Sequence, residues 1–403
     1  MSTITYTQRR PSVSLTSKPV YKDTFGRDFV PPEFTIKDIL DAIPKHCFDR
    51  SLARSLTYVA RDIFYTACLF GLATQIHHIP SLPARVVAWV VYGFVQGLVC
   101  TGIWVLAHEC GHGAFSPYKL ANDIVGWILH SALFVPYHSW RITHSKHHKA
   151  TGHLARDMVF IPKDVNRYKL SRNIAELTEE APVVTLYFLF AQQLFGWPAY
   201  LAANVTGQNY PGVSNWSLSH FFPSAPMFDA KDFWDIIISD VGIVVAGTLA
   251  YLGIEKWGWA SFALYYFMPY LWVNNWLVCI TYLQHTDPSL PHYDASEWNF
   301  ARGAAATVDR DFGFIGRHLF HEIIETHVAH HYSSRIPFYH AEEATKAIRK
   351  VMGKHYRQDK TNLILALWKT ARACQFVEGD GGVKMYRNAN GIGIAPKEGK
   401  KAK

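Results

Sequence analysis

Long apolar stretches divide an otherwise polar sequence. Residues 86–107 contain no charged side chain, and residues 257–284 form a second uncharged stretch with four Trp or Tyr residues near its start. Residues 63–79 are shorter and also uncharged, while residues 236–254 are interrupted only by Asp240. About 20 apolar residues in a helix cross the roughly 30 Å hydrocarbon core of a bilayer, so the pattern predicts four membrane-spanning helices. We place these spans at residues 60–79, 86–107, 236–254 and 259–284.

Two further apolar stretches are not counted as spans. Residues 124–136 are too short to cross, so we expect them to lie in the membrane interface or to re-enter. Residues 183–205 are long enough, but Gln192, Gln193 and Pro198 interrupt them. We therefore expect this second stretch to stay on one side of the membrane.

Lysine and arginine residues predict the orientation of the spans. Nine of them lie between Arg9 and Arg54, whereas the short links around residues 80–85 and 255–258 contain one each. Cytosolic segments carry the excess of positive charge, so both termini are expected in the cytosol. The predicted fold class is an all-α integral membrane protein, with four transmembrane helices in two hairpins and a cytosolic helical cap.

The composition changes at both ends of the chain. Residues 1–35 are rich in Ser, Thr, Pro and Arg and are expected to be disordered, and residues 376–403 are rich in Gly and Lys and are expected to form a flexible tail. Residues 36–375 are expected to form the main domain. The last four residues, Lys-Lys-Ala-Lys, resemble a dilysine retrieval signal for the endoplasmic reticulum.

The charge balance narrows the set of partners. The formal net charge is +8 and the pI is near 9.0, but the basic residues flank apolar segments and form no single dense stripe. We therefore expect an anionic membrane surface as the partner and exclude nucleic acid. The six cysteines show no paired spacing and are expected to be reduced.

Eight of the 21 histidines fall into three short boxes. The boxes are His108-Glu-Cys-Gly-His112, His144-Ser-Lys-His147-His148 and His327-Val-Ala-His330-His331. Residues three or four apart share one face of a helix, so each box is expected to aim its imidazoles at a single point. Imidazole binds zinc, iron, copper and nickel, and eight ligands exceed the three or four of one zinc site. The boxes therefore predict a two-metal centre.

The predicted spans place all three boxes on one side of the membrane. The first box lies at the cytosolic end of the second span, the second in the following cytosolic loop, and the third after the fourth span. Counting residues 183–205 as a span would put the third box on the opposite side from the other two. This agreement supports the four-span topology.

The sequence around the boxes resembles the membrane fatty acid desaturases, particularly the Δ12/ω3 group that acts on phospholipid-bound acyl chains. The similar segments are HECGHGAFSPY, WRITHSKHHKATGHLARDMVFIPK, IPFYHAEEATKAIRKVMGKHY and the stretch from Ile280 to His331. The resemblance extends from about residue 35 to about residue 380, and GFIGRH and VMGKHY are typical of fungal members.

This resemblance implies a di-iron enzyme that uses O₂ and two electrons to remove two hydrogens from an unactivated acyl chain. It implies nine iron ligands, the ninth at the cytosolic end of the fourth span: His108, His112, His144, His147, His148, His285, His327, His330 and His331. Related acyl-CoA desaturases have an Asn one turn before the ninth histidine, which holds an iron-bound water. This chain has Thr281 there, so the water site is an open question.

The resemblance also implies external electron donors. The haem-binding HPGG motif of fused cytochrome b5 domains is absent, and no GxGxxG loop follows a predicted strand. A separate cytochrome b5 and NADH-cytochrome b5 reductase are therefore the expected partners. The third box starts with His327, where front-end desaturases have Gln, which argues against that subgroup. Association with further copies of the chain stays open.

The predicted reaction is Δ12 desaturation of oleoyl chains on phosphatidylcholine to linoleoyl chains, in the endoplasmic reticulum membrane. An ω3 (Δ15) or bifunctional Δ12/ω3 activity stays open because regiochemistry depends on sub-ångström positioning of the acyl chain. The acyl carrier, phospholipid or CoA, also stays open. Related hydroxylases and conjugases share the boxes and are not excluded.

Two other classes of protein compete with this interpretation. His108-Glu-Cys-Gly-His112 satisfies the HExxH pattern of zinc metalloproteases, but that class leaves the other two boxes without a role. A histidine-rich metal transporter would need ligands along its spans, whereas these histidines lie at their ends.

Other polar residues near the boxes are expected to support the centre from outside it. Carboxylates that could orient ligand imidazoles are Glu109, Asp157, Asp309, Asp311, Glu322 and Glu325. Histidines expected to form hydrogen bonds rather than bind metal are His130, His138, His153, His318 and His321.

Overall fold

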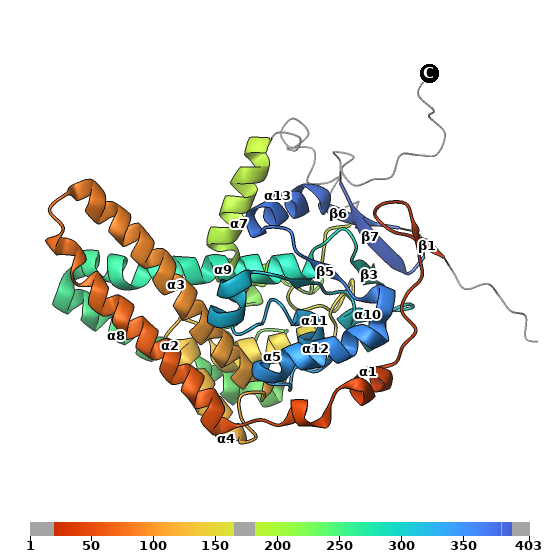
Figure 1. Cartoon of the computed structure of the whole chain (residues 1–403), viewed down its shortest axis with the longest axis horizontal. Helices are drawn as coiled ribbons and strands as arrows, with labels where there is room; N and C mark the ends of the chain where they lie inside the picture. Colours follow the sequence, from red (N-terminus) through yellow and green to blue (C-terminus); the bar gives the residue numbers. More distant parts are fainter. Residues whose placement is uncertain (1–19, 165–181, 380, 389–403) are drawn as a thin grey trace, which may run out of the picture.

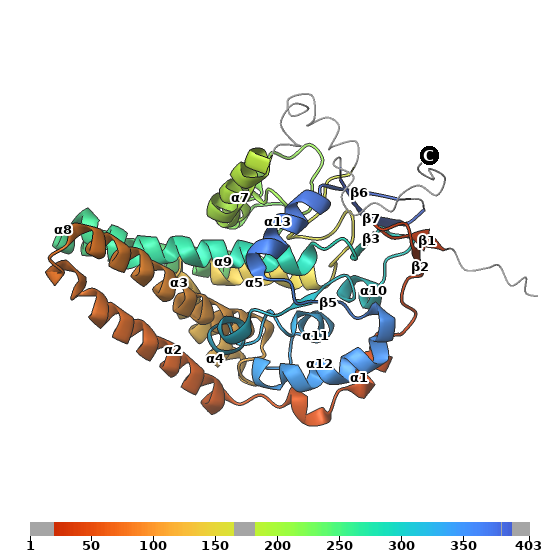
Figure 2. The ribbon, with the colours of Figure 1, turned by 45° about the horizontal axis from the view of Figure 1, so that its top comes forward.

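The computed structural model describes residues 20–164, 182–379 and 381–388. Figures 1 and 2 show most of the long helices projecting to one side, with shorter helices and strands gathered at their other end, whereas α7 runs in a different direction. The long helices are α2 (Leu52–Ala73), α3 (Leu82–His112), α7 (Pro182–Ala203), α8 (Phe233–Phe262) and α9 (Met268–His285). The shorter helices are α1 (Ile36–Ala42), α4 (Lys119–Ser131), α5 (Tyr137–His148), α10 (Phe300–Ala304), α11 (His327–Tyr332), α12 (Phe338–Met352) and α13 (Leu363–Ala373).

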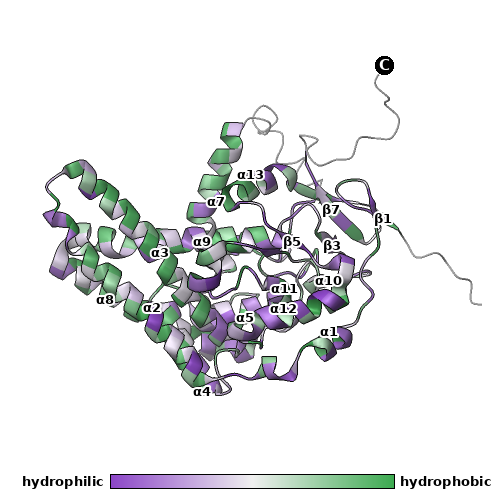
Figure 3. Ribbon diagram, viewed as in Figure 1, coloured by the Kyte–Doolittle hydropathy of each residue, from purple (hydrophilic) through white to green (hydrophobic). Residues whose placement is uncertain are grey.

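Two helical runs in the described part of the chain are long and apolar enough to cross a membrane. They are α3 and the run Ala230–His285, which contains α8 and α9 joined by a π-helical turn, η5 (Ala263–Phe267). The backbone leaves helical geometry at Gly258, which has φ 81° and ψ 160°, so this run bends there. Figure 3 shows hydrophobic residues along the projecting parts of α2, α3 and α8.

The first predicted span differs from the helix that forms. Residues 60–79 were expected to be helical, but α2 begins at Leu52 and ends at Ala73. Its start is fixed by Ser51, whose side chain accepts a hydrogen bond from the Arg54 N–H. The first half of α2 carries Arg54, Arg61 and Asp62, so hydropathy alone does not locate this end.

Helices α3 and α9 pack closely because glycine lines their contact. A Cβ atom on Gly97 would lie 2.3 Å from the Trp272 Cβ, which is closer than two carbon atoms can approach. Small residues let helix backbones approach in this way. Helix α9 therefore runs directly beside α3 (Figure 2), and its last residue, His285, lies against His147 and His331 of the second and third boxes.

Short strands add to the helical architecture, which departs from the all-α prediction. The strands are β1 (Tyr21–Lys22), β2 (Asp28–Phe29), β3 (Pro291–Tyr293), β4 (Asp309–Arg310), β5 (Gln358–Asp359), β6 (Phe376–Glu378) and β7 (Val383–Arg387). They form an antiparallel β1–β2 pair, a parallel β4–β5 pair and an antiparallel sheet in the order β3–β7–β6, in which Tyr293 pairs with Val383.

Two terminal segments were therefore wrongly predicted to lack structure. Residues 21–22 and 28–29, in the expected disordered terminus, and residues 376–378 and 383–387, in the expected flexible tail, form strands. The reason is a small buried cluster in which Phe29 packs with Tyr293, Val383 and Met385. The composition of a short segment does not reveal such a cluster, because the residues that form it are far apart in the chain.

Two hydrophobic cores position the histidine boxes. The larger core joins α3, α5 and α9 through side chains such as Leu106, Trp140 and Leu283. The smaller core packs α1 and α12 against α11, with Ile39, Ile348 and Val328 fully buried. Helix α11, which carries the third box, thus lies between the helical bundle and the N-terminal segment (Figure 1).

Candidate metal centre

Five of the predicted ligands form one group. His108 and His112 come from the last turns of α3, His144 and His148 from α5, and His330 from α11. One ring nitrogen from each lies within 4.8 Å of those of the other four. The Nε2 atom of His144 is 3.0 Å from that of His108 and 3.2 Å from that of His148.

The other four predicted ligands form a second group. Ring nitrogens of His147, His285 and His331 lie within 4.8 Å of one another. His327 extends this group, because its Nε2 is 3.1 Å from the Nε2 of His285. The structure thus brings together all nine histidines that the sequence singles out.

Helix geometry divides the second and third boxes between the two groups. Successive residues turn by about 100° around a helix, so positions i and i+4 point in similar directions and adjacent residues diverge. In α5, His144 and His148 join the first group and His147 joins the second. In α11 the division is reversed, with His330 in the first group and His331 in the second. The expectation that each box aims at a single point is therefore wrong for these two boxes.

Burial keeps the imidazoles in the neutral form that binds metals. Desolvation, followed by repulsion from neighbouring imidazoles, holds the pKa of His148, His330 and His331 well below its usual value. A neutral imidazole offers a lone pair to a metal, whereas a protonated one does not.

The donor set fits two metal ions. Among the described residues, the Nε2 atoms of His147, His330 and His331 are buried without a hydrogen-bond partner. Leaving buried polar nitrogens unpaired is costly, and a bound ion would remove that cost. Groups of five and four imidazoles suit borderline metals such as iron rather than Mg²⁺ or Ca²⁺, which prefer oxygen ligands.

A carboxylate and a hydroxyl orient two of the nine rings. Asp157 Oδ1 lies 2.6 Å from the Nδ1 of His147, and it also accepts a hydrogen bond from the backbone N–H of Val159. Thr151 Oγ1 lies 3.1 Å from the Nδ1 of His331. Such partners fix the ring orientation and leave the opposite nitrogen free for a metal.

In the described structure the remaining candidate carboxylates form no hydrogen bond to the ring of a predicted ligand, although Glu109 Oε1 lies 3.9 Å from the Nδ1 of His108. Glu109 Oε2 accepts a hydrogen bond from the Phe338 N–H, and Asp309 Oδ1 accepts one from the Val328 N–H. Burial raises the pKa of Asp309 to about 7. Asp311 accepts a hydrogen bond from the Gly313 N–H, and Glu325 accepts one from the Phe312 N–H. Glu322 belongs to neither histidine group.

The five histidines that were expected not to bind metal lie outside both groups in the described structure. His130 Nε2 is 3.2 Å from the Trp104 carbonyl oxygen, and His321 Nε2 is 2.7 Å from Asp62 Oδ2. The others are His138, His153 and His318.

Two neighbours of the centre were not predicted. Trp140 stacks on the ring of His144 with a centroid separation of 4.5 Å, and Thr151 is the partner of His331 described above. Sequence spacing could have indicated both residues. Trp140 lies four residues before His144, and Thr151 lies four residues after His147. Thr281, at the open water position, bonds to the Leu277 carbonyl oxygen in its own helix.

A cavity of about 150 Å³ adjoins both groups. His108, His144 and His327 reach it, and the rest of its wall is mainly apolar, with Trp104, Trp197 and Leu277. Helices α7 and α9 form one side of it. Thr281 also lines this cavity.

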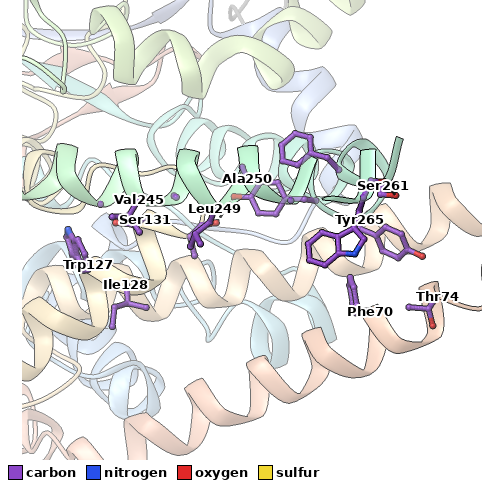
Figure 4. A pocket seen from close by; sticks show the side chains of 17 residues that line it. Phe70, Thr74, Trp127, Ile128, Ser131, Val245, Leu249, Ala250, Ser261 and Tyr265 are labelled. Carbon is purple, nitrogen blue, oxygen red and sulfur yellow. Dashed lines mark hydrogen bonds between the residues drawn. The ribbon is translucent and has the colours of Figure 1, made fainter. Parts of the chain in front are cut away.

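A larger apolar cavity of about 800 Å³ lies elsewhere, between α2, α4 and α8 (Figure 4). Phe70, Trp127, Leu249 and Tyr265 line it, and none of the nine histidines does. The smaller cavity is therefore the one that can present a ligand to the metal centre.

Comparison with known proteins identifies the family. A family model described as fatty acid desaturase matches residues 83–361, and a model described as a domain of unknown function, DUF3474, matches residues 10–74. The chain is 50% identical to the oleate hydroxylase of Claviceps purpurea over 406 residues, covering 93% of this chain and 85% of the relative.

Two desaturases show similar agreement. The Δ12 fatty acid desaturase of Mortierella alpina is 50% identical over 394 residues, covering 94% of this chain and 97% of the relative. The endoplasmic reticulum ω6 fatty acid desaturase of Brassica juncea is 45% identical over 378 residues, covering 92% and 95%. Matches of this length and identity exclude the metalloprotease interpretation. The chain belongs to the fatty acid desaturase family.

Proposed function

We propose that this protein is an O₂-dependent di-iron acyl-lipid desaturase that converts oleoyl chains on phospholipid to linoleoyl chains. The observation that carries the proposal is the pair of histidine groups beside one apolar cavity. The Δ12 position follows from the similarity to the Mortierella desaturase.

Each histidine group would hold one iron. The first would use His108, His112, His144, His148 and His330, and the second His147, His285, His327 and His331. Two bound irons supply the reduction of O₂ with two electrons, so that one CH₂–CH₂ unit, O₂, two electrons and two protons give one CH=CH unit and two waters.

The protein's own side chains orient the acyl chain and exclude water. Trp104, Trp197 and Leu277 form an apolar part of the cavity wall beside the histidines, so an acyl chain in the cavity is desolvated next to the centre. The cavity is smaller than the roughly 300–1,000 Å³ of most ligand pockets, so it fits only the reacting part of an oleoyl chain. The remaining methylene groups must extend past α7 or α9.

The membrane placement belongs to the same proposal. We infer four spans formed by α2, α3, α8 and α9, with the histidine groups and both termini on the cytosolic side of the endoplasmic reticulum membrane. Apolar side chains exposed on these helices, such as Phe64, Val87 and Leu249, support contact with lipid. A separate cytochrome b5, reduced by its NADH-dependent reductase, would supply the electrons.

Hydroxylation of the oleoyl chain is the second candidate. The oleate hydroxylase of Claviceps purpurea matches this chain as well as the Mortierella desaturase does. Both outcomes start with removal of a hydrogen from the same region of the chain, so the fold and the histidines do not separate them.

The test is expression of the full chain in a yeast that makes no polyunsaturated fatty acids, with gas chromatography of its acyl chains. Linoleoyl chains are expected, and they should appear first in the phospholipid fraction. A hydroxylated oleoyl product would favour the second candidate. A triply unsaturated product without linoleoyl accumulation would overturn the Δ12 assignment.

A further inference from the structure

A third group of metal-binding side chains lies outside the centre described above. His46 belongs to a short 3-10 helix, η1 (Lys45–Phe48), and His340 and Glu343 belong to α12. One ligand atom of each lies within 4.8 Å of those of the other two. The Nε2 of His46 is 2.9 Å from the Oε2 of Glu343.

Packing beneath the group fixes the positions of its backbones. Next to His46, the Cys47 side chain is fully buried in the same core as Ile43, Ala344 and Ile348. His340 and Glu343 are three residues apart and share one face of α12. The bases of the three side chains are thus held by a packed core while their tips reach solvent.

The three tips are accessible to a dissolved ion. The side chains of His46 and Glu343 are 53% and 52% exposed. The ring of His340 meets that of His46 edge-on, with centroids 5.8 Å apart. Tetrahedral zinc bonded at about 2.0–2.2 Å separates its ligand atoms by roughly 3.4 Å, so small side-chain rotations would close the site.

The chemistry selects a class of ion. Two imidazoles and one carboxylate form a three-ligand zinc site that keeps a fourth position for water. Besides the imidazole of His46, the charged groups near His340 are Asp49, Glu343 and Arg54; with His46 neutral these sum to one negative charge, which favours a cation. A hydrogen bond between His46 and Glu343 alone contributes little stability at an exposed position and gives no role to His340.

We propose that His46, His340 and Glu343 form a binding site for a zinc-class divalent transition metal. The ion joins the segment before α2 to α12, two parts of the chain almost 300 residues apart. Helix α12 begins at Phe338, whose N–H donates a hydrogen bond to Glu109 within the first histidine box. A metal at this site therefore clamps the N-terminal segment to the helix that supports the iron centre.

The test uses the full chain in detergent micelles, with its iron loaded, and Co²⁺ as a spectroscopic probe. One Co²⁺ per chain is expected to bind with the visible absorption of a four-coordinate ion, without loss of iron, and Zn²⁺ should displace it. His340→Gln and Glu343→Gln should each weaken Co²⁺ binding at least about tenfold. Even loss of a residue that only forms a hydrogen bond to a metal ligand has an effect of this size.

Glu342→Gln is the matched control, because Glu342 is exposed on the same helix and pairs with Lys346. This variant should bind Co²⁺ as the wild type does. Zn²⁺ should also raise the unfolding temperature of the wild type and of Glu342→Gln but not of Glu343→Gln. Absence of bound Co²⁺, equal binding by all variants, or uptake matched by iron loss would each overturn the proposal.

Discussion

The carboxylate of Asp157 and the imidazole of His147 are joined by a hydrogen bond of 2.6 Å, and both side chains are buried. Because an ionised carboxylate only accepts, His147 donates through its Nδ1–H and presents Nε2 to the second histidine group. Backbone N–H groups of Val159 and Phe160 hold the carboxylate in place.

Replacing Asp157 with Asn should weaken the second metal position selectively. The amide can still accept a hydrogen bond but carries no charge to polarise the ring, so metal affinity should fall by about 10- to 100-fold. Iron per chain, measured by mass spectrometry after dialysis, should approach one. Asp311→Asn is the control, because Asp311 bonds to Gly313 and Arg317 away from the centre. Two irons retained in Asp157→Asn would contradict this role.

His147→Ala and His330→Ala should each remove a different iron. His147 belongs to the second group and His330 to the first, so each variant should lose product while keeping its place in the membrane. Loss of a ligand should lower turnover by more than about a hundredfold. Product analysis of microsomes tests this, with His153→Ala as the control because His153 lies outside both groups. Retained turnover in either variant would count against the ligand assignment.

Gly196→Leu should block the small cavity without disturbing the metals. Gly196 lines the cavity on α7, and a Cβ there would lie 3.2 Å from a methyl group of Val278 on α9. A larger side chain must point into the space proposed for the acyl chain, so turnover should fall by about 10- to 100-fold. Iron content should not change.

Gly247→Leu provides the comparison, since no atom lies within 4 Å of a Cβ at that position on α8. Gas chromatography of products and iron analysis should be made on both variants. Equal turnover in the two would place the acyl chain elsewhere.

Acid should destabilise the fold partly through His220. Burial lowers the pKa of His220 to about 4, whereas an unfolded histidine titrates near 6.5. Between these values the unfolded chain takes up a proton that the folded chain does not. The stability that His220 contributes is therefore complete above about pH 6.5 and declines as the pH falls toward 4.

His220→Gln tests this dependence on pH. His220 Nε2 lies 3.0 Å from Thr143 Oγ1, a contact that an amide can also make. The unfolding temperature of the variant should fall less steeply than that of the wild type between about pH 6.5 and pH 4. Exposed His78, replaced with Gln, should leave the slope unchanged. A slope unaltered by His220→Gln would rule out its contribution.

Local spacing predicted much of the centre. The intervals within the boxes placed His108 with His112 and His144 with His148 because helix geometry is set by neighbouring residues. Adjacent residues on a helix diverge, but the assignment of His147 and His148 to two separate groups was not predicted, since it also depends on where α11 and α9 lie relative to α5. Ligation by the nine histidines stays a prediction.

Long-range contacts explain what the sequence pattern missed. The strand pairing of Tyr293 with Val383 and the contact of Thr151 with His331 join residues 90 or more positions apart, and no local periodicity encodes them. The early start of α2 was missed for a related reason. Asp62 on that helix is buried against His321, 259 residues away, so a charge that interrupts the apolar pattern does not end the helix.

The exchange of histidines between α5 and α11 makes the two metal positions interdependent. Each helix contributes to both groups, so neither group is complete unless both helices are docked. Binding of the first ion would order α11, so most of the entropy cost of ordering this helix would fall on that step. The second ion would then bind to a site whose ligands are already in position. Loading should thus be cooperative, and chains that carry a single iron should be rare during maturation of the wild-type enzyme.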